Sequence, residues 1–504
     1  MNWTILPQTS EILAIHAALL HTGHIVYFGG DEHDKGHHDT QQIDATRLFD
    51  CATLAVTPLP SPQTDVFCCG HALLPGGRLL IAGGTEAFPQ TVDTLHHESF
   101  TGTREAWIFN PVTRSWVQAA SMIPEPGHEA DNTGGGRWYP TLVTLPSGRV
   151  LAVSGGTSAN DTRLNNDGCE VFQPVPKPRG RWMRMGNQRR AVSFYPRLHL
   201  LPNGDVFCGN AVPAGQVPNR NHAFRPATGK WRDVCDGLID PLYDSVSATS
   251  VLLPLLPADI YRPRILKCGA QQPMIIDLGA DSPAWQPTPP RALAGSPVRR
   301  HANAVLLPTG DVFVCGGISN TADSSDTSAV LTPELYSSAG NAWSLLAPAT
   351  IPRNYHSVAL LMPDGRVWTA GSNLDAQQSF LPPGANNREL RFEIFEPDYF
   401  TANRPQIDQA PAFAAWGRSF IVRTPVANAI QRVALIRNGS VTHAFDSDQR
   451  YVGLKFTVTG EHRIRVAAPP NGRVAPPGWY LLFLIDDQGV PSVGSFIRIG
   501  AAQE

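Results

Sequence analysis

One position of a repeated hairpin collects the reactive side chains of this chain. It lies nine residues before the glycine of each hairpin turn. Its occupants are Ala14, Cys68, Tyr139, Tyr195, His301 and His356, and Tyr355 lies one residue further out. A position that only filled space would favour small or aliphatic residues, whereas this one carries phenols, imidazoles and a thiol. Those are the donors of a transition-metal site. If the hairpins place this position on one ring, these distant residues converge on one metal.

The repeated hairpin consists of an apolar run, a tight turn with glycine, and a second strand that ends in small residues. Its clearest copy is 353–371, RNYHSVALLMPDGRVWTAG. The other copies are 14–30, 68–84, 139–156, 195–209, a degenerate 247–269 and 301–317. The turn glycines recur at about 50–70 residues once the degenerate copy is included, the period of kelch-type propeller blades. The sequence therefore predicts a seven-bladed β-propeller over residues 1–401.

A second signature between the copies is typical of the outer strands of blades. It is an aromatic residue, a polar turn and a tryptophan, as in Phe109 to Trp116, Phe224 to Trp231 and Tyr336 to Trp343. In a propeller the innermost strand of each blade lines the central channel. Equivalent positions on those strands then lie on one ring, which is the arrangement that the proposed metal site needs.

The chain changes character near residue 402. The aromatic and tryptophan signature disappears, and short alternating segments follow at 419–424, 432–437, 451–457, 462–467, 479–486 and 496–499. They resemble an immunoglobulin-like β-sandwich over residues 402–504. The predicted fold is therefore all-β, a seven-bladed kelch-type propeller followed by a small β-sandwich. In the polar stretch 441–450, His443 taken alone is expected to face solvent from a hairpin.

The composition excludes several classes of function. The 504 residues include 44 glycines and 45 prolines spread along the chain, as a turn-rich all-β protein requires. A net charge of −3 without a block of Lys and Arg argues against nucleic-acid binding. No apolar run is long enough to cross a membrane. We therefore expect a monomer that binds small molecules, and neither nucleic acid nor a membrane.

The cysteines and the first residues give an expectation for the compartment. Eight cysteines are too few for a disulfide framework in a chain of this length. The start, MNWTILPQTSE, has no basic segment followed by an apolar run, so no signal peptide is visible. The sequence as given predicts a cytoplasmic protein.

Several motifs resemble the signatures of copper-radical oxidases, the galactose oxidase and glyoxal oxidase family. They are Phe67-Cys68-Cys69-Gly70, Arg137-Trp138-Tyr139, Arg353-Asn354-Tyr355-His356 with its PDGRV turn, Thr442-His443, Asp448-Gln449-Arg450, PPGWY at 476–480 and GVPSV at 489–493. The motifs run in order through nearly the whole chain and occur in both predicted domains.

This resemblance implies a set of site residues. Tyr139, Tyr355, His356 and His443 would be the ligands of one copper ion, and Cys68 would form a thioether with the Tyr139 ring to create a radical cofactor. A loop of the C-terminal domain would enter the propeller channel and bring His443 to the metal, which replaces the solvent-facing interpretation of this histidine.

The implied reaction is the two-electron oxidation of a primary alcohol or aldehyde, with O2 reduced to H2O2 and Tyr355 as general base. The residues agree with this chemistry. Two imidazoles and phenolate oxygen suit Cu(II), which accepts one electron, so a second redox centre must lie within bonding reach. A thioether-substituted tyrosine, which is easier to oxidise than a plain phenol, supplies it.

The sequence differs from the family pattern in three places. Galactose oxidase stacks a tryptophan over its thioether, shortly after a Gly-Gly pair, but here Gly155-Gly156 precede Thr157-Ser158. Trp138 could contact the site instead, although packing is its default role. No carbohydrate-binding domain precedes the propeller, which disfavours a polymeric sugar as substrate. Family members are commonly secreted, which leaves secretion open for this chain.

Other residues support weaker hypotheses. The run 31–38, DEHDKGHH, could bind a metal, but a solvated loop is the favoured interpretation. His71, His128 and His301 could lie behind the ligands or in the core, and Arg137 and Arg353 could orient substrate or brace loops. Glu125 and Glu129 could form a glycosidase pair, although nothing places them across a cleft. The alternative to an oxidase is a non-catalytic kelch propeller that binds a protein or sugar, which has no need for the reactive ring.

Overall fold

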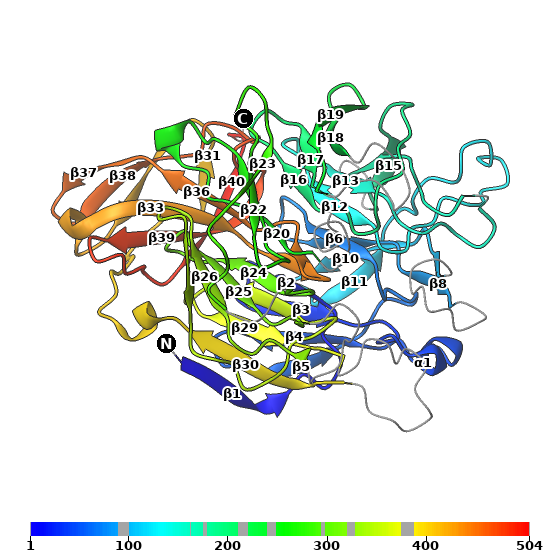
Figure 1. The fold of residues 1–504 in the computed structure, drawn as a ribbon, viewed down its shortest axis with the longest axis horizontal. Coiled ribbons are helices and arrows are strands. Elements are labelled where there is room, and N and C mark those ends of the chain that lie inside the picture. Colours follow the sequence, from blue (N-terminus) through cyan, green and yellow to red (C-terminus); the bar gives the residue numbers. More distant parts are fainter. Residues whose placement is uncertain are drawn as a thin grey trace.

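The protein is almost entirely β-structure in the computed structural model (Figure 1). The structure describes residues 2–88, 100–161, 163–174, 179–209, 220–238, 248–293, 298–319, 328–373 and 388–502. Its helical parts are α1 (Lys35–Asp39) and the 3-10 segments η2 (Pro257–Asp259), η4 (Asp398–Thr401) and η5 (Ala427–Ala429). Within these described ranges, no helix has the length and apolarity that a membrane crossing needs. The predicted all-β class is confirmed.

Seven sheets in the described residues contain four adjacent antiparallel strands of one plan, running from a buried first strand to an exposed last strand. The first strands are β2 (His16–Leu19), β6 (Gly70–Leu73), β12 (Thr141–Thr144), β16 (Leu198–Leu200), β20 (Ser250–Leu252), β24 (Asn303–Leu306) and β28 (Val358–Leu361). The second strands are β3 (His24–Phe28), β7 (Leu79–Ala82), β13 (Val150–Val153), β17 (Val206–Cys208), β21 (Arg264–Lys267), β25 (Val312–Cys315) and β29 (Val367–Ala370).

The third and last strands complete these sheets. The third strands are β4 (Thr46–Asp50), β10 (Ala106–Asn110), β14 (Glu170–Gln173), β18 (Arg220–Arg225), β22 (Met274–Asp277), β26 (Glu334–Ser337) and β30 (Arg391–Glu396). The last strands are β5 (Val56–Leu59), β11 (Ser115–Gln118), β15 (Arg181–Arg184), β19 (Lys230–Asp236), β23 (Trp285–Pro287), β27 (Ala342–Leu345) and β1 (Asn2–Thr9). A small separate sheet pairs β8 (Thr85–Ala87) with β9 (Thr101–Gly102).

The turn glycines explain why each copy of the repeat folds into a hairpin. Gly23, Gly77, Gly148, Gly204, Gly310 and Gly365 all have φ between 78° and 92°. An L-residue with a β-carbon rarely adopts this conformation, whereas glycine does so without cost. The first and second strands on either side of each turn pair as the sequence predicts, and the degenerate copy contributes β20 and β21 in the same way.

The N-terminal strand closes the set of sheets. β1 pairs antiparallel with β30, with Trp3 opposite Phe395, so the two strands lie side by side although 392 positions of the chain separate these residues (395 − 3) (Figure 1). Neighbouring sheets also meet through their first strands: β6 lies beside β12, β12 beside β16, β24 beside β28, and β28 beside β2. The first and last repeats are therefore adjacent in space.

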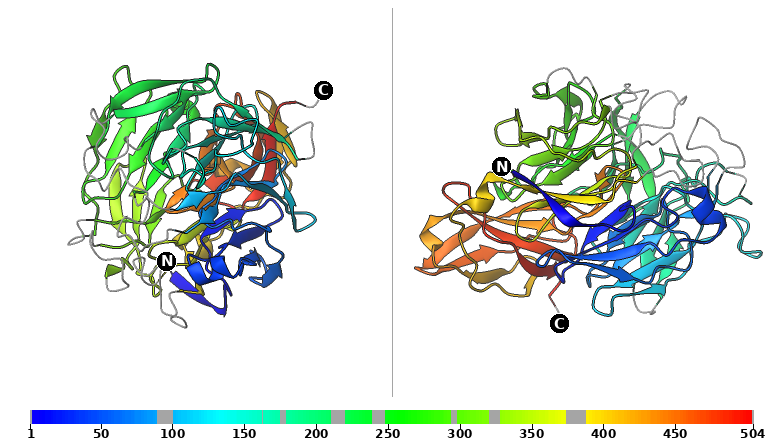
Figure 2. Two further views of the ribbon diagram at one scale, coloured as in Figure 1. Left: turned by 90° about the vertical axis from the view of Figure 1, so that its right-hand side faces the viewer. Right: turned by 90° about the horizontal axis from the view of Figure 1, so that it is seen from below.

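The C-terminal strands form two further sheets at one side of the molecule (Figure 2). One contains β31 (Phe413–Ala415), β40 (Ser495–Gly500), β39 (Gly478–Asp486), β33 (Ile430–Arg437) and β36 (Arg450–Leu454). The other contains β32 (Ser419–Arg423), β38 (Arg463–Ala467) and β37 (Phe456–Gly460). Val433 and Leu435 pack into the core of these strands, whereas Ala434 and Ile436 join the core of the N-terminal part. β33 is thus buried on both faces, because alternate residues point to opposite sides.

Between β33 and β36 the chain forms a hairpin of β34 (Ser440–Thr442) and β35 (Phe445–Asp446). We call residues 440–450 the central hairpin. β34 pairs with β2, with Thr442 opposite His16, and the two hairpin strands also touch β6, β20, β24 and β28. Because it adds to the first strand of one sheet and contacts the first strands of others, the hairpin lies at their common centre.

Three consecutive residues anchor the central hairpin to three different first strands. The carboxylate of Asp448 accepts the N–H of Leu73 on β6 at 2.6 Å. The amide of Gln449 bonds Ala304 and Leu306 of β24 at 2.8 and 3.0 Å. The Arg450 guanidinium donates to the carbonyl of Leu200 on β16 at 2.9 Å. The Asp448-Gln449-Arg450 motif therefore fixes the hairpin relative to the sheets.

A buried ion pair stabilises this junction and yields a prediction. The Arg437 guanidinium lies 3.1 Å from Asp448 and donates to the Leu73 carbonyl at 3.0 Å. Removing one partner of a buried pair leaves the other charge uncompensated, so we expect Arg437→Ala to lower the free energy of unfolding by about 3–5 kcal/mol. Urea unfolding followed by tryptophan fluorescence measures this change.

The matched control is Arg432→Ala, on the same strand. Arg432 is exposed and also donates to a backbone carbonyl of the N-terminal part, that of Thr309 at 2.7 Å. Its loss should change the free energy of unfolding by no more than about 0.5 kcal/mol. Equal losses in the two variants would show that the ion pair does not stabilise the junction.

Candidate functional site

The ring position adopts an unusual backbone conformation in five of the repeats. φ is 60° at Cys68, 64° at Tyr139, 42° at Tyr195, 60° at His301 and 65° at His356. Each residue lies two or three positions before its first strand begins. A left-handed conformation costs a non-glycine residue roughly 1–2 kcal/mol, and such strain concentrates at functional sites. The chain thus bends sharply at the same place in each of these repeats.

Backbone hydrogen bonds join these bends from one sheet to the next. The Tyr139 N–H donates to the Cys68 carbonyl at 3.0 Å, and the Tyr195 N–H donates to the Tyr139 carbonyl at 2.7 Å. Cys68, Tyr139 and Tyr195 also belong to one buried apolar cluster. Cys68 and Tyr139 are therefore neighbours, although 71 residues separate them (139 − 68).

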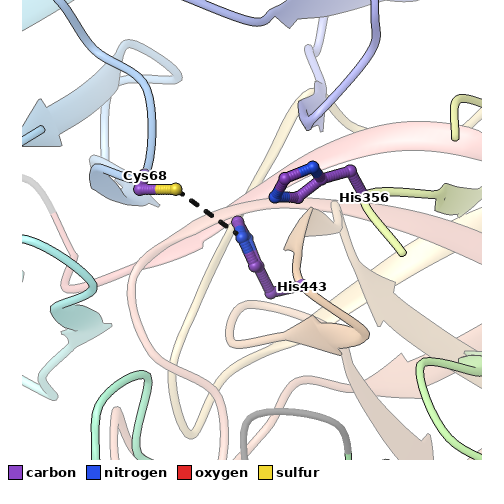
Figure 3. Close-up of side chains that lie close together, drawn as sticks. All are labelled: Cys68, His356 and His443. Carbon is purple, nitrogen blue, oxygen red and sulfur yellow. Dashed lines mark hydrogen bonds between the residues drawn. The ribbon is translucent and has the colours of Figure 1, made fainter. Parts of the chain in front are cut away.

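The central hairpin delivers His443 to the same place. His443 follows β34, has φ of 47°, and is only 2% exposed. Its Nε2 lies 3.2 Å from the Tyr139 hydroxyl and 3.7 Å from the Cys68 sulfur. Figure 3 shows the imidazole directed at Cys68, with His356 on the other side. The solvent-facing interpretation of this histidine alone is therefore wrong.

Tyr355 and His356 complete the cluster. The hydroxyls of Tyr139 and Tyr355 share a hydrogen bond. The His356 ring stacks on Tyr355 with centroids 3.7 Å apart and meets His443 edge-on at 4.7 Å. The structure thus brings together the five residues Cys68, Tyr139, Tyr355, His356 and His443. Two further ring residues stand directly behind them, Tyr195 at 4.4 Å from the Tyr139 ring and His301 at 5.0 Å from Tyr355.

Hydrogen bonds to Nδ1 select the tautomer of both histidines, in which Nε2 faces the cluster. The Thr442 hydroxyl donates to the Ile15 carbonyl at 3.0 Å, so its oxygen accepts the Nδ1–H of His443 at 2.7 Å. Nδ1 of His356 bonds the amide oxygen of Asn373. In both rings the proton lies on Nδ1 and the lone pair on Nε2, the arrangement in which an outer partner orients a metal-binding imidazole.

Asn373 was not anticipated from the sequence, although a signal existed. β28 and β29 are antiparallel with Val358 opposite Ala370. Residues just before β28 therefore lie beside those just after β29, which includes the polar pair Ser372-Asn373.

Burial keeps the donor groups uncharged. It lowers the pKa of His443 far below its usual value, and the neighbouring His356 and His16 act in the same direction. It raises the pKa of Tyr139 and Tyr355 far above the usual value for a phenol, and that of Cys68 above the usual value for a thiol. Neutral imidazoles are ready to bind a metal, whereas the phenols need a bound cation to release their protons.

The donor set fits copper. Two imidazole nitrogens and two phenol oxygens match the nitrogen and oxygen ligands that tetragonal Cu(II) prefers. The buried thiol of Cys68 adds a group that can be oxidised next to one phenol. Cys68, His356 and His443 alone place three ligand atoms within 4.8 Å of one another.

Trp138 has a closer relation to the site than its default packing role suggested. Its ring stacks on Tyr139 with centroids 3.7 Å apart and planes 7° apart. Phe100 also stacks on the Trp138 ring, with the two ring centroids 4.6 Å apart. Neighbouring residues in a strand point to opposite faces, but the bend at Tyr139 allows these two rings to overlap.

The two candidate arginines have structural roles. Arg137 is buried in an ion pair with Glu170 at 2.8 Å, and Arg353 donates to the carbonyls of Gly371 and Arg391. Both arginines therefore brace loops. His128 is exposed beside Asp131. All eight cysteines are buried and free of disulfides.

The structure places Glu125, Glu129 and His71 away from any catalytic pair, as the weaker interpretations of these residues expected. Glu125 and Glu129 pair with Arg163 and Arg184 respectively rather than with each other. His71 lies in the core, where its Nδ1 meets the Ser440 hydroxyl. His16, which no motif singled out, is fully buried with its ring 5.3 Å from His71 and 6.1 Å from His443.

The solvated-loop interpretation of residues 31–38 is wrong for its first half. Asp31, Glu32 and His33 are buried, and only the later residues include exposed ones. The His33 ring stacks on Phe67 at 5.1 Å and lies 5.2 Å from His356. These residues are buried because the segment between β3 and α1 packs against Phe67 and His356.

Two family models together match most of the chain. The model Glyoxal oxidase N-terminus matches residues 29–399, and Galactose oxidase-like, Early set domain matches residues 404–499. The chain is 29% identical over 556 residues to Aldehyde oxidase GLOX of Vitis pseudoreticulata, covering 99% of this chain and 97% of that protein. It is 25% identical over 485 residues to Galactose oxidase of Gibberella zeae, covering 90% and 63%.

A solved structure shares the fold. It is described as a novel fungal alcohol oxidase with catalytic diversity among the AA5 family, in complex with copper, and it matches with a TM-score of 0.77 over 99% of both chains at 21% identity. At that identity the likeness concerns the fold alone.

The hydrogen bond that orients His443 yields a prediction. Thr442→Val keeps the shape of the side chain but removes the acceptor of the Nδ1–H. We expect copper affinity to fall by about 10–100-fold, the usual effect of losing an outer partner of a ligand. Competition titration with a chelator measures it. The control is Thr457→Val on the exposed strand β37, and an equal loss of affinity in both variants would contradict the orienting role.

Proposed function

We propose that this chain, which belongs to the glyoxal oxidase family by its match to Glyoxal oxidase N-terminus over residues 29–399, is a copper-radical oxidase. Its reaction is the two-electron oxidation of a primary alcohol or aldehyde with reduction of O2 to H2O2. The observation that carries the proposal is the convergence of Cys68, Tyr139, Tyr355, His356 and His443 in one buried cluster. A binding scaffold has no need for that combination.

We propose that residues 1–401 form a seven-bladed β-propeller and residues 402–504 a β-sandwich that contributes one ligand. The shared plan of the seven sheets and the closing pair of β1 and β30 support the first part. The common core of the two C-terminal sheets supports the second.

Tyr139, Tyr355, His356 and His443 would hold the copper ion. When bound, copper supplies a one-electron acceptor and a Lewis acid that lowers the pKa of a hydroxyl it coordinates. The chain supplies the rest. Thr442 and Asn373 hold the two imidazoles with Nε2 toward the cluster, and burial excludes water from the reacting atoms.

Cys68 and Tyr139 would supply the second one-electron centre. A thioether forms when the Cys68 S–H and one ring C–H of Tyr139 each lose a hydrogen, the sulfur bonds to the ring carbon, and O2 takes both hydrogens as H2O2. The sulfur makes the ring easier to oxidise. Trp138 covers one face of this ring and would shield it, in the place of the tryptophan that the sequence lacks after Gly156.

In an alcohol, or in the hydrate that an aldehyde forms with water, the substrate hydroxyl would give its proton to the phenolate oxygen of Tyr355. The substrate then gives up one further hydrogen from carbon and one electron, so that two protons and two electrons leave in all. O2 accepts the same number to give H2O2, which balances the cycle. The curated relatives are named for aldehyde and galactose, so we infer a primary alcohol or an aldehyde as the substrate class.

The thioether is the most direct test of the function. Wild-type protein treated with copper and O2 should yield a Cys68 peptide joined to a Tyr139 peptide, lighter than their sum by two hydrogens in mass spectrometry. Cys68→Ala should lose this product and peroxide release, whereas Cys69→Ala, which removes the adjacent buried thiol, should keep both. Wild-type protein that stays uncrosslinked under these conditions would favour the non-catalytic scaffold.

The role of Tyr355 is tested by Tyr355→Phe. Loss of the proton acceptor should lower kcat/KM by about 10²–10⁴-fold, the usual contribution of a general base, while the thioether still forms. Peroxide release from a panel of primary alcohols and aldehydes gives the rates. The control is Tyr27→Phe, a buried tyrosine whose hydroxyl donates to the Ser10 carbonyl at 2.9 Å. Unchanged kcat/KM in Tyr355→Phe would remove this residue from the chemistry.

A further inference from the structure

A second group of potential metal ligands lies outside the proposed copper cluster. It consists of Asp31, which follows β3, His38 in α1, and Asp65, which precedes Cys68 by three residues. One ligand atom from each lies within 4.8 Å of the other two. Both carboxylates are buried, at 0% and 5% exposure, and the His38 side chain is 14% exposed. The group is therefore enclosed but can be reached from solvent along His38.

Backbone hydrogen bonds hold one oxygen of each carboxylate. Oδ1 of Asp65 accepts the N–H groups of Asp31 and Phe67 at 3.1 and 3.0 Å. Oδ1 of Asp31 accepts the N–H of His33 at 2.7 Å. The other oxygen of each group, Oδ2, is left to face His38. Such outer contacts are what fix the orientation of carboxylate ligands in metal sites.

The second oxygens and the imidazole have the spacing of a coordination shell. His38 Nδ1 lies 2.8 Å from Asp65 Oδ2 and 3.6 Å from Asp31 Oδ2. Ligands about 2.0–2.2 Å from a zinc ion in tetrahedral geometry stand roughly 3.3 Å apart, between these two values. Asp31 Oδ2 is fully enclosed and accepts no hydrogen bond within the described part of the chain. A buried carboxylate oxygen without a donor is costly, and a cation would satisfy it.

The charge balance also favours a divalent cation. Two carboxylates share this pocket, and a protonated His38 could compensate only one of them.

We propose that Asp31, His38 and Asp65 form a second metal site, separate from the copper cluster, that binds a zinc-class divalent cation through two carboxylate oxygens and one imidazole nitrogen. Mixed oxygen and nitrogen ligands suit zinc better than calcium, which takes oxygen ligands alone. Three protein ligands leave a position for water. The ion would link residues 31–38 to the segment that precedes Phe67 and Cys68. His33 and Phe67, which belong to these two segments, stack on each other, and His33 packs beside His356.

The test measures zinc bound by the full chain. Protein first loaded with one equivalent of copper is incubated with Zn²⁺, separated from free metal by gel filtration and analysed by mass spectrometry for metals. We expect about one zinc per chain, in line with a three-ligand site. His38→Ala should weaken zinc binding by at least about 100-fold, more than the loss of an outer partner does. The matched control is His37→Ala, because His37 is the neighbouring histidine and its Nδ1 meets a backbone carbonyl, that of Asp31 at 3.3 Å.

A second readout separates a specific site from loosely held metal. Co²⁺ in place of zinc should give visible absorption bands that are present in wild type and His37→Ala and absent in His38→Ala and Asp31→Asn. Circular dichroism verifies the fold. If Asp31→Asn does not fold, His38→Ala alone carries the test, because the His38 side chain is partly exposed. Zinc retention equal in wild type and His38→Ala, or no zinc in wild type, overturns the proposal.

The result does not depend on the copper chemistry. In a variant with both His356→Ala and His443→Ala, which disables the central cluster, zinc and the cobalt bands should persist with the same dependence on His38. Loss of zinc binding in this double variant, together with its retention in His38→Ala, would assign the metal to the central cluster and refute a second site.

Discussion

The central hairpin is the contact on which the rest of the structure depends. Residues 440–450 belong to the C-terminal part of the chain, yet β34 extends the sheet of β2. The side chains of Asp448, Gln449 and Arg450 reach β6, β24 and β16. Asp448 also meets the Thr144 hydroxyl of β12 at 3.4 Å, and the hairpin strands touch β20 and β28. All seven first strands are thereby tied to one short segment.

This arrangement couples stability to function. The same hairpin that holds the first strands together carries His443, and the buried Arg197 fixes it further by donating to the His443 carbonyl at 2.8 Å. A buried guanidinium is expensive, and burial lowers the pKa of Arg197 to about 9. The cost is tolerated because the bond fixes the backbone of a residue that must point at Tyr139 and Cys68.

Strain and burial together prepare the site for a cation. Bulky residues at five ring positions adopt a left-handed backbone, which each would avoid in isolation. The surrounding sheets impose this conformation, and it directs phenols and imidazoles inward. Burial then keeps these groups neutral, so the cluster has no counter-charge of its own. A metal ion that releases the phenol protons would supply this counter-charge. Its binding would explain why strained backbone and buried polar side chains occur together at this site.

The sequence by itself determined the local structure. Hairpins depend on neighbouring residues, so the glycine turns, the strands on either side of them and most strands of the C-terminal region could be located from pattern alone. The expected segment 451–457 instead covers parts of two strands, β36 and β37, which lie in different sheets. The alignment on the turn glycines also identified Cys68, Tyr139, Tyr355 and His356 as a group, because equivalent positions in equivalent hairpins face the same way.

Only the tertiary structure decided what distant segments do together. Alternation says which face of a strand is apolar, but it does not name the partner, so the pairing of β1 with β30 and of β34 with β2 could not be deduced. The stack of Trp138 on Tyr139 depends on a left-handed backbone conformation that tyrosine disfavours. The burial of Asp31 depends on the segment around Asp65, which lies beside it. Each of these outcomes arises from contacts between segments far apart in the chain, and short-range preferences carry no information about them.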